Sequence, residues 1–117
     1  APSSANAETS RFESYVMTAE RFISGNYSLN ISVEDIAASA GISRTTLFRA
    51  FKEITGISPV EYLTRFRTDR AARLLMETDL SVSAVSNSVG YEDSLYFSKV
   101  FRKYKGISPT EARKLYI

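Results

Sequence analysis

The spacing of apolar positions predicts a chain built from helices. In the first patterned stretch, apolar residues recur every three or four positions along one helix face. These residues are Phe12, Tyr15, Val16, Ala19, Phe22 and Ile23. Gly25 and Asn26 follow them as a typical helix end. This first helix is interpreted as scaffold.

The stretch from Gly41 to Pro59 occurs a second time from Gly90 to Pro109. Each copy starts at a glycine, passes through a short polar turn and continues as a helix with apolar and basic faces. Both copies end in Gly-Ile-Ser-Pro. Leu47 and Phe51 match Phe97 and Phe101, and the second copy has one extra residue near its turn. The repeat indicates a duplicated small unit.

A short helix precedes each repeated helix. Ser32 is the expected N-cap of the first, with Asp35 in the reciprocal capping position, and Ala37 is small enough for a close helix crossing. Ser43 and Asp93 are the expected N-caps of the two repeated helices, which should span about residues 43–55 and 93–105. A helix, a glycine turn and a second helix are typical of a helix-turn-helix, whose second helix enters the major groove of DNA.

A longer helix should join the two repeats. Ser58, Pro59 and Glu61 form a typical helix start, and Thr78 and Asp79 end the pattern. Ser108 and Glu111 repeat the capping pattern before a short last helix. The predicted fold is all-α, with about seven helices. The expected division is a disordered tail at 1–10, helix-turn-helix subdomains at 11–57 and 79–117, and a linker helix at 58–78.

Composition narrows the possible functions. The 117 residues contain no Cys and no His, so disulfides, thiolate metal sites and His-based catalysis are excluded. Scattered carboxylates such as Glu53 and Asp69 are the remaining candidates for a hydrolytic enzyme, without a Gly-rich phosphate loop nearby. We therefore expect no enzyme, no cofactor and no metal. We also expect no transmembrane helix, because no long apolar run is present.

The charge is unevenly distributed. The net charge is +2, yet residues 1–42 carry two basic and five acidic side chains, whereas residues 43–117 carry thirteen basic and eight acidic ones. A basic surface on the repeats suits a polyanionic partner. Ordinary solvated helix faces explain the same charges equally well.

Two helix-turn-helix units joined by one long helix resemble the DNA-binding domain of the AraC/XylS family of bacterial transcription regulators. The resemblance covers residues 11–117 and is most specific between Gly90 and Tyr104, followed by Gly106 and Pro109. The linker helix matches the family at Arg67, Ala71, Leu74 and Leu75. Val85-Ser86 departs from the family's usual Ile-Ala, although Ser86 is still small.

The resemblance implies a bacterial cytoplasmic, nucleoid-associated regulator that binds double-stranded promoter DNA. Each recognition helix would enter one of two successive major grooves. RNA polymerase is an expected partner, and dimerisation is expected through a domain outside this chain.

Candidate DNA contacts lie on the outward faces of the two recognition helices. The base-contact candidates of the first helix are Arg44, Thr45, Thr46 and Arg49, and those of the second are Ser94, Leu95, Ser98 and Lys99. Arg pairs with guanine, and Thr or an apolar side chain contacts the thymine methyl. For Arg49 the alternative is phosphate contact or plain solvation. For the threonines it is that they fill the first helical turn, and for Leu95 it is packing at the rim. The phosphate-contact candidates are Lys52, Arg102, Lys103 and Lys105.

The aromatic residues of the repeats are expected in the core, because single-strand binders expose their aromatics on a platform and these residues have buried helical spacing. They are Phe48, Phe51, Tyr96, Phe97 and Phe101. A protein–protein interaction module remains the alternative function. Salt distinguishes the two, because only DNA binding weakens steeply as the salt concentration rises.

Overall fold

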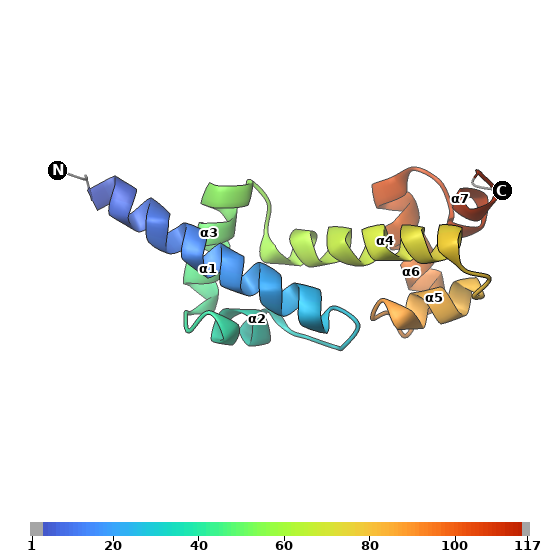
Figure 1. Cartoon of the computed structure of the whole chain (residues 1–117), viewed down its shortest axis with the longest axis horizontal. Coiled ribbons are helices and arrows are strands. Elements are labelled where there is room, and N and C mark those ends of the chain that lie inside the picture. Colours follow the sequence, from blue (N-terminus) through green and yellow to red (C-terminus); the bar gives the residue numbers. More distant parts are fainter. Residues whose placement is uncertain (1–3, 116–117) are drawn as a thin grey trace. The chain divides into compact units, whose positions relative to one another are not determined.

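The computed structural model describes residues 4–115. This part of the chain is all-helical and contains seven helices (Figure 1). They are α1 (Ser4–Asn26), α2 (Val33–Ser39), α3 (Arg44–Thr55), α4 (Pro59–Glu77), α5 (Val82–Ser88), α6 (Ser94–Lys105) and α7 (Pro109–Leu115). The predicted fold class is therefore confirmed.

Helices α2, α3 and α6 begin directly after their predicted N-caps Ser32, Ser43 and Asp93. The Ser32 hydroxyl accepts a hydrogen bond from the Asp35 amide, and the Asp35 carboxylate accepts one from the Ser32 amide, so the capping box of α2 is complete. Ser43, Ser81 and Asp93 cap α3, α5 and α6 in the same local way. The two recognition helices both end at glycines in the left-handed conformation, Gly56 and Gly106.

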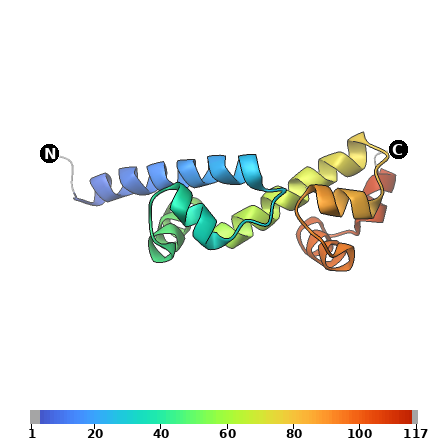
Figure 2. The ribbon, with the colours of Figure 1, turned by 90° about the horizontal axis from the view of Figure 1, so that it is seen from below.

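Packing contacts divide the chain into two units, which are described separately. Unit 1 comprises residues 4–26 and 31–63. In this unit α1 packs against α2 and crosses α3, as Figure 1 shows together with Figure 2. The buried apolar side chains of unit 1 come from all three helices. They include Phe12, Val16, Ala19, Ile23, Ile36, Ala37, Leu47, Ala50 and Phe51.

Unit 2 comprises residues 27–30 and 64–115. Its core draws one or two side chains from each of α4, α5, α6 and α7. The buried members are Ala71, Leu75, Val85, Val89, Phe97, Phe101 and Ala112. Arg113 of α7 donates hydrogen bonds to the Leu75 and Thr78 carbonyls, so α7 is fixed to the end of α4.

The turn between the two helices has the same geometry in both units. The Ile42 amide donates to the Ala37 carbonyl at 3.1 Å, and the Tyr91 amide donates to the Ser86 carbonyl at 3.0 Å. Ser86 is fully buried, and its hydroxyl donates to the Tyr91 carbonyl. The serine thus keeps the close helix crossing and has its own hydrogen-bond partner.

The prediction of a disordered tail at 1–10 is wrong for residues 4–10, which form the first turns of α1. Residues 1–3 lie outside the described part. Sequence periodicity starts only at Phe12, but Glu8 forms an ion pair with Arg49 of α3, which ties the early turns of α1 to unit 1. The contact boundary falls inside α4, between Leu63 and Thr64. The division into subdomains with a separate linker at 58–78 stays a prediction.

Within residues 4–115, none of the helices combines the length and the apolar character that crossing a bilayer requires.

Candidate nucleic-acid interface

The outward face of α3 is set by the cap at its start. Ser43 accepts a hydrogen bond from the Thr46 amide at 3.1 Å, which fixes Arg44 as the first helical residue. Leu47 and Phe51 are fully buried on the inner side. The side chains of Arg44, Thr45 and Arg49, by contrast, are exposed.

Both outward arginines of α3 have acidic and aromatic neighbours within unit 1. The Arg44 guanidinium lies 2.9 Å from the Glu34 carboxylate and over the ring of Phe48. Arg49 lies 3.1 Å from the Glu8 carboxylate and over the ring of Phe12. All four charged side chains are 41–65% exposed, so each pair contributes at most about 1 kcal/mol. Arginines held so weakly are free to exchange partners.

The hydrogen bond from Arg44 to Glu34 also affects the pKa of the Glu34 carboxyl group. A backbone hydrogen bond and then the hydrogen bond from Arg44 lower the pKa of Glu34 below its ordinary value of 4.5. Glu34 is therefore charged at neutral pH, and the pair is an ion pair rather than a neutral hydrogen bond.

The two candidate threonines of α3 differ. The Thr46 hydroxyl accepts a hydrogen bond from the Ser43 hydroxyl at 3.0 Å, and its side chain is half-buried. This arrangement favours the alternative that Thr46 completes the first helical turn. Thr45 is exposed beside Arg44 and Arg49. Base contact by either threonine stays a prediction.

The first turns of α6 carry fewer charged side chains on their outward face than those of α3. Asp93 accepts hydrogen bonds from the Leu95 and Tyr96 amides, which fixes the first turn of the helix. Leu95 is 77% exposed, which is the largest exposure among the big apolar side chains of the described residues. Lys99 is exposed, whereas Ser94 and Ser98 are half-buried. Leu95 is therefore accessible, and base contact and rim packing at this residue both stay predictions.

The expectation that Tyr96 belongs to the core is wrong, because its side chain is 57% exposed. It precedes Phe97, which takes the buried position of the helix, and so it lies at the edge of the apolar stripe. Its ring packs 6.0 Å from that of Tyr91. Phe51, Phe97 and Phe101 are fully buried as predicted, but Phe48 is only half-buried.

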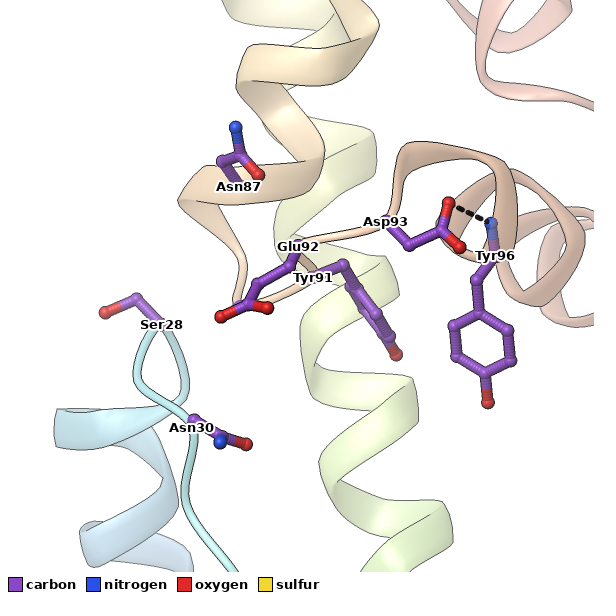
Figure 3. A pocket seen from close by; sticks show the side chains of 8 residues that line it. Ser28, Asn30, Asn87, Tyr91, Glu92, Asp93 and Tyr96 are labelled. Atoms are coloured by element: carbon purple, nitrogen blue, oxygen red, sulfur yellow. Dashed lines mark hydrogen bonds between the residues drawn. The ribbon is translucent and has the colours of Figure 1, made fainter.

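A pocket with a volume of about 520 Å³, lined mainly by residues with polar groups, lies beside the start of α6 (Figure 3). It is lined by Ser28, Asn30, Asn87, Gly90, Tyr91, Glu92, Asp93 and Tyr96. Segment 27–30 reaches this place because Arg67 of α4 donates hydrogen bonds of 2.9 Å to the Tyr27 and Leu29 carbonyls. Sequence reasoning missed the pocket, since this contact joins residues about forty positions apart.

The phosphate-contact candidates also differ in the contacts that they make within the protein. Arg102 is exposed, and the Lys103 ammonium lies over the ring of Tyr104. The Lys52 ammonium donates to the Gly56 carbonyl at the end of α3. Lys105 forms an ion pair with Asp69 of α4, which fixes the end of α6 within unit 2. Lys105 thus has a structural role in addition to the predicted phosphate contact.

Residues 36–115 match the family model of a helix-turn-helix domain. The chain is 47% identical over 92 residues to the lactose operon transcription activator of Staphylococcus xylosus, covering 79% of this chain and 33% of that protein. It is 39% identical over 102 residues to the Msm operon regulatory protein of Streptococcus mutans, covering 87% and 37%. The chain thus spans about a third of the length of these curated relatives.

Solved structures agree with this match. A transcriptional regulator with an AraC-type DNA-binding domain from Chromobacterium violaceum has a TM-score of 0.83 and 30% identity, covering 87% of this chain and 91% of that one. The DNA-binding domain of AdpA, solved with a target DNA, has a TM-score of 0.81 and 30% identity, covering 88% and 92%. These relatives are transcription regulators and not enzymes, in agreement with the expectation. The chain therefore belongs to the AraC-type helix-turn-helix DNA-binding domains.

Proposed function

We propose that this chain binds double-stranded promoter DNA sequence-specifically, placing α3 and α6 in successive major grooves. The observation that carries the proposal is the repeated turn, Ile42 to Ala37 and Tyr91 to Ser86, followed each time by a capped helix with an exposed polar or basic outer face. Such a helix offers its N-terminal residues to base edges. The likeness to the AdpA domain solved with DNA supports the same function.

The parent protein is proposed to regulate transcription in the bacterial nucleoid, in contact with RNA polymerase. The relatives are about three times as long as this chain and are named as operon regulators, which supports a further domain for dimerisation. The DNA-binding step itself belongs to the residues present here.

Selection of bound duplexes from a random DNA pool tests the proposal. The 117-residue chain should enrich one sequence pattern. If four basic side chains neutralise phosphates, affinity should fall about 100-fold between about 50 and 200 mM salt, because each contact releases counterions. An unenriched pool, or affinity independent of salt, would contradict DNA binding and favour a protein-docking module.

Single substitutions distinguish residues that contact bases from residues that contact phosphates. Arg49→Ala should cost about 1–3 kcal/mol of binding and relax the preference at one or two base pairs. Lys103→Ala should weaken binding to all duplexes alike, because a phosphate contact carries no sequence information. Binding curves over a panel of duplexes measure both. Uniform loss for both variants would mean that the assignment of base and phosphate contacts is wrong.

A further inference from the structure

Phe48 has a surface position that its spacing in the sequence does not predict. Its neighbours Leu47 and Phe51 are fully buried, whereas Phe48 is half-buried. Together with Arg44, Thr45 and Arg49 it lines an open hollow of about 410 Å³ with a mostly apolar wall. All four residues belong to α3, at positions i, i+1, i+4 and i+5, so they form one face of the recognition helix.

Charged groups surround the ring of Phe48. The Arg44 guanidinium lies 5.4 Å from the ring centroid and is held by Glu34 at 2.9 Å. Arg49 lines the same hollow and forms an ion pair with Glu8 at 3.1 Å. Phe48, with Arg44 over its ring, is therefore the main apolar side chain of this hollow.

The major groove presents one apolar group, the C5-methyl of thymine, and phenylalanine is among the side chains that contact it. Arginine pairs with the O6 and N7 atoms of guanine in the same groove. We propose that Phe48 is a specificity residue that recognises the methyl group of a thymine next to a guanine bound by Arg44 or Arg49. This inference rests on the proposed function and specifies the base that α3 selects.

The second copy of the repeat supplies a matched control. The position equivalent to Phe48 is Ser98, and the position equivalent to Thr45 is Leu95, which is 77% exposed. The half-buried Phe48 of α3 and the exposed Leu95 of α6 thus occupy different positions of the repeat. A thymine contacted by α6 should depend on Leu95 and be insensitive to Phe48.

Replacing single thymines by deoxyuridine removes only the methyl group and tests the proposal directly. The probe is the duplex most enriched from the random pool by the whole chain. At one thymine next to a base pair whose preference Arg44→Ala or Arg49→Ala relaxes, deoxyuridine should weaken binding about fourfold. This is the effect of about 0.8 kcal/mol for one buried methyl-sized group, at 1.4 kcal/mol per tenfold.

Two variants of Phe48 separate methyl recognition from support of Arg44. Phe48→Ala should bind the thymine and deoxyuridine duplexes equally, while sensitivity at a thymine contacted by Leu95 persists. Leu95→Ala should give the opposite result. Phe48→Leu keeps an apolar side chain without an aromatic face for Arg44, so it should retain most of the methyl sensitivity. Circular dichroism of each variant establishes that it is folded.

Different results overturn different statements. If the wild-type chain enriches a duplex but no thymine in the α3 half-site is sensitive to deoxyuridine, Phe48 does not recognise a methyl group. If Phe48→Ala weakens binding while the sensitivity remains, Phe48 only positions Arg44. If the pool is not enriched at all, the proposed function fails and this inference fails with it.

Discussion

Gly90 lies where the α5–α6 turn meets segment 27–30 and α4, all within unit 2. Its φ is +99°, a region that favours glycine. A Cβ atom there would lie 2.6 Å from the Tyr27 carbonyl oxygen and 3.0 Å from the Arg67 Nε and Nη2 atoms. Gly90→Ala should lower the free energy of unfolding by about 2–4 kcal/mol, since backbone strain and crowding add. Urea denaturation measures this.

Gly25→Ala is the matched control for that experiment. Gly25 lies near the end of α1, and nothing stands within 4 Å of the place where its Cβ would be. Alanine has the better helix propensity, so this variant should be as stable as the wild type or up to about 1 kcal/mol more stable. Equal losses in the two variants would show that the contact with Tyr27 and Arg67 is not what makes Gly90 sensitive.

If Arg49 contacts a base as proposed, Glu8 and DNA compete for the same guanidinium. Arg49 would then have to leave the Glu8 carboxylate, 3.1 Å away, to reach the base. Because a surface pair of this kind is worth at most about 1 kcal/mol, Glu8→Gln should raise DNA affinity by at most about fivefold. Fluorescence anisotropy with the selected duplex measures the change.

Glu13→Gln removes the same charge from an exposed position on α1 and serves as the control. It should raise affinity less than Glu8→Gln, since it removes only long-range repulsion of DNA. In the Arg49→Ala background, Glu8→Gln should lose its extra effect. If it does not, the carboxylate acts on the DNA directly and not through Arg49.

At the scale of the helices, the sequence predicted the ends well and the contacts between helices poorly. The caps at Ser32, Ser43 and Asp93 involve residues two or three positions apart, so the local sequence contains all the participants. The bonds from Arg49 to Glu8 and from Arg67 to Tyr27 join residues 41 and 40 positions apart. They depend on how helices pack, which periodicity does not encode.

The candidate interface shows the same limit. Helical spacing correctly placed Arg44, Thr45, Arg49 and Lys99 on exposed faces, because one buried stripe defines the opposite side. It assigned Phe48 and Tyr96 to the core, although each lies at the edge of that stripe. Whether a residue at the edge of the stripe is buried depends on the neighbouring helices. The apolar residue type alone is therefore insufficient to predict its burial.

The capping box of α2 should make stability depend on pH. The hydrogen bond from the Ser32 backbone amide, and then the bond with its side chain, lower the pKa of Asp35 below the ordinary value of 3.8. The folded state therefore binds this proton less readily than the unfolded chain. The stabilisation is complete above the unfolded pKa and is lost as pH falls through the folded pKa.

Asp35→Ala should accordingly be less stable than the wild type near neutral pH, and the difference should shrink by about pH 3. Urea denaturation over this pH range measures it. Glu53→Ala is the control, because Glu53 is an exposed residue in the middle of α3. This substitution removes a carboxylate without removing a helix cap. A difference between Asp35→Ala and wild type that stays constant with pH would mean that the charge of Asp35 does not stabilise the helix.

At the scale of the whole molecule, α4 contributes to both units. Tyr62 packs its ring 5.7 Å from that of Phe51 in unit 1, whereas Ala71 and Leu75 belong to the core of unit 2. The helix has 19 residues, which corresponds to about 28 Å at 1.5 Å per residue. Successive major grooves on one face of DNA are about 34–36 Å apart. We expect α4 to set the spacing of two half-sites about 10 base pairs apart.

Insertions at the contact boundary between Leu63 and Thr64 test this role of α4. Two inserted alanines should turn the following part of the helix by about 200°, and four by about 400°, which is close to the original direction. If α4 fixes the phase, the two-residue insertion should protect only one half-site in footprinting. The four-residue insertion should recover part of the second, because it restores the direction and adds only about 6 Å. Circular dichroism should find both variants helical. An unchanged footprint at both half-sites in the two-residue variant would mean that α4 does not set the spacing.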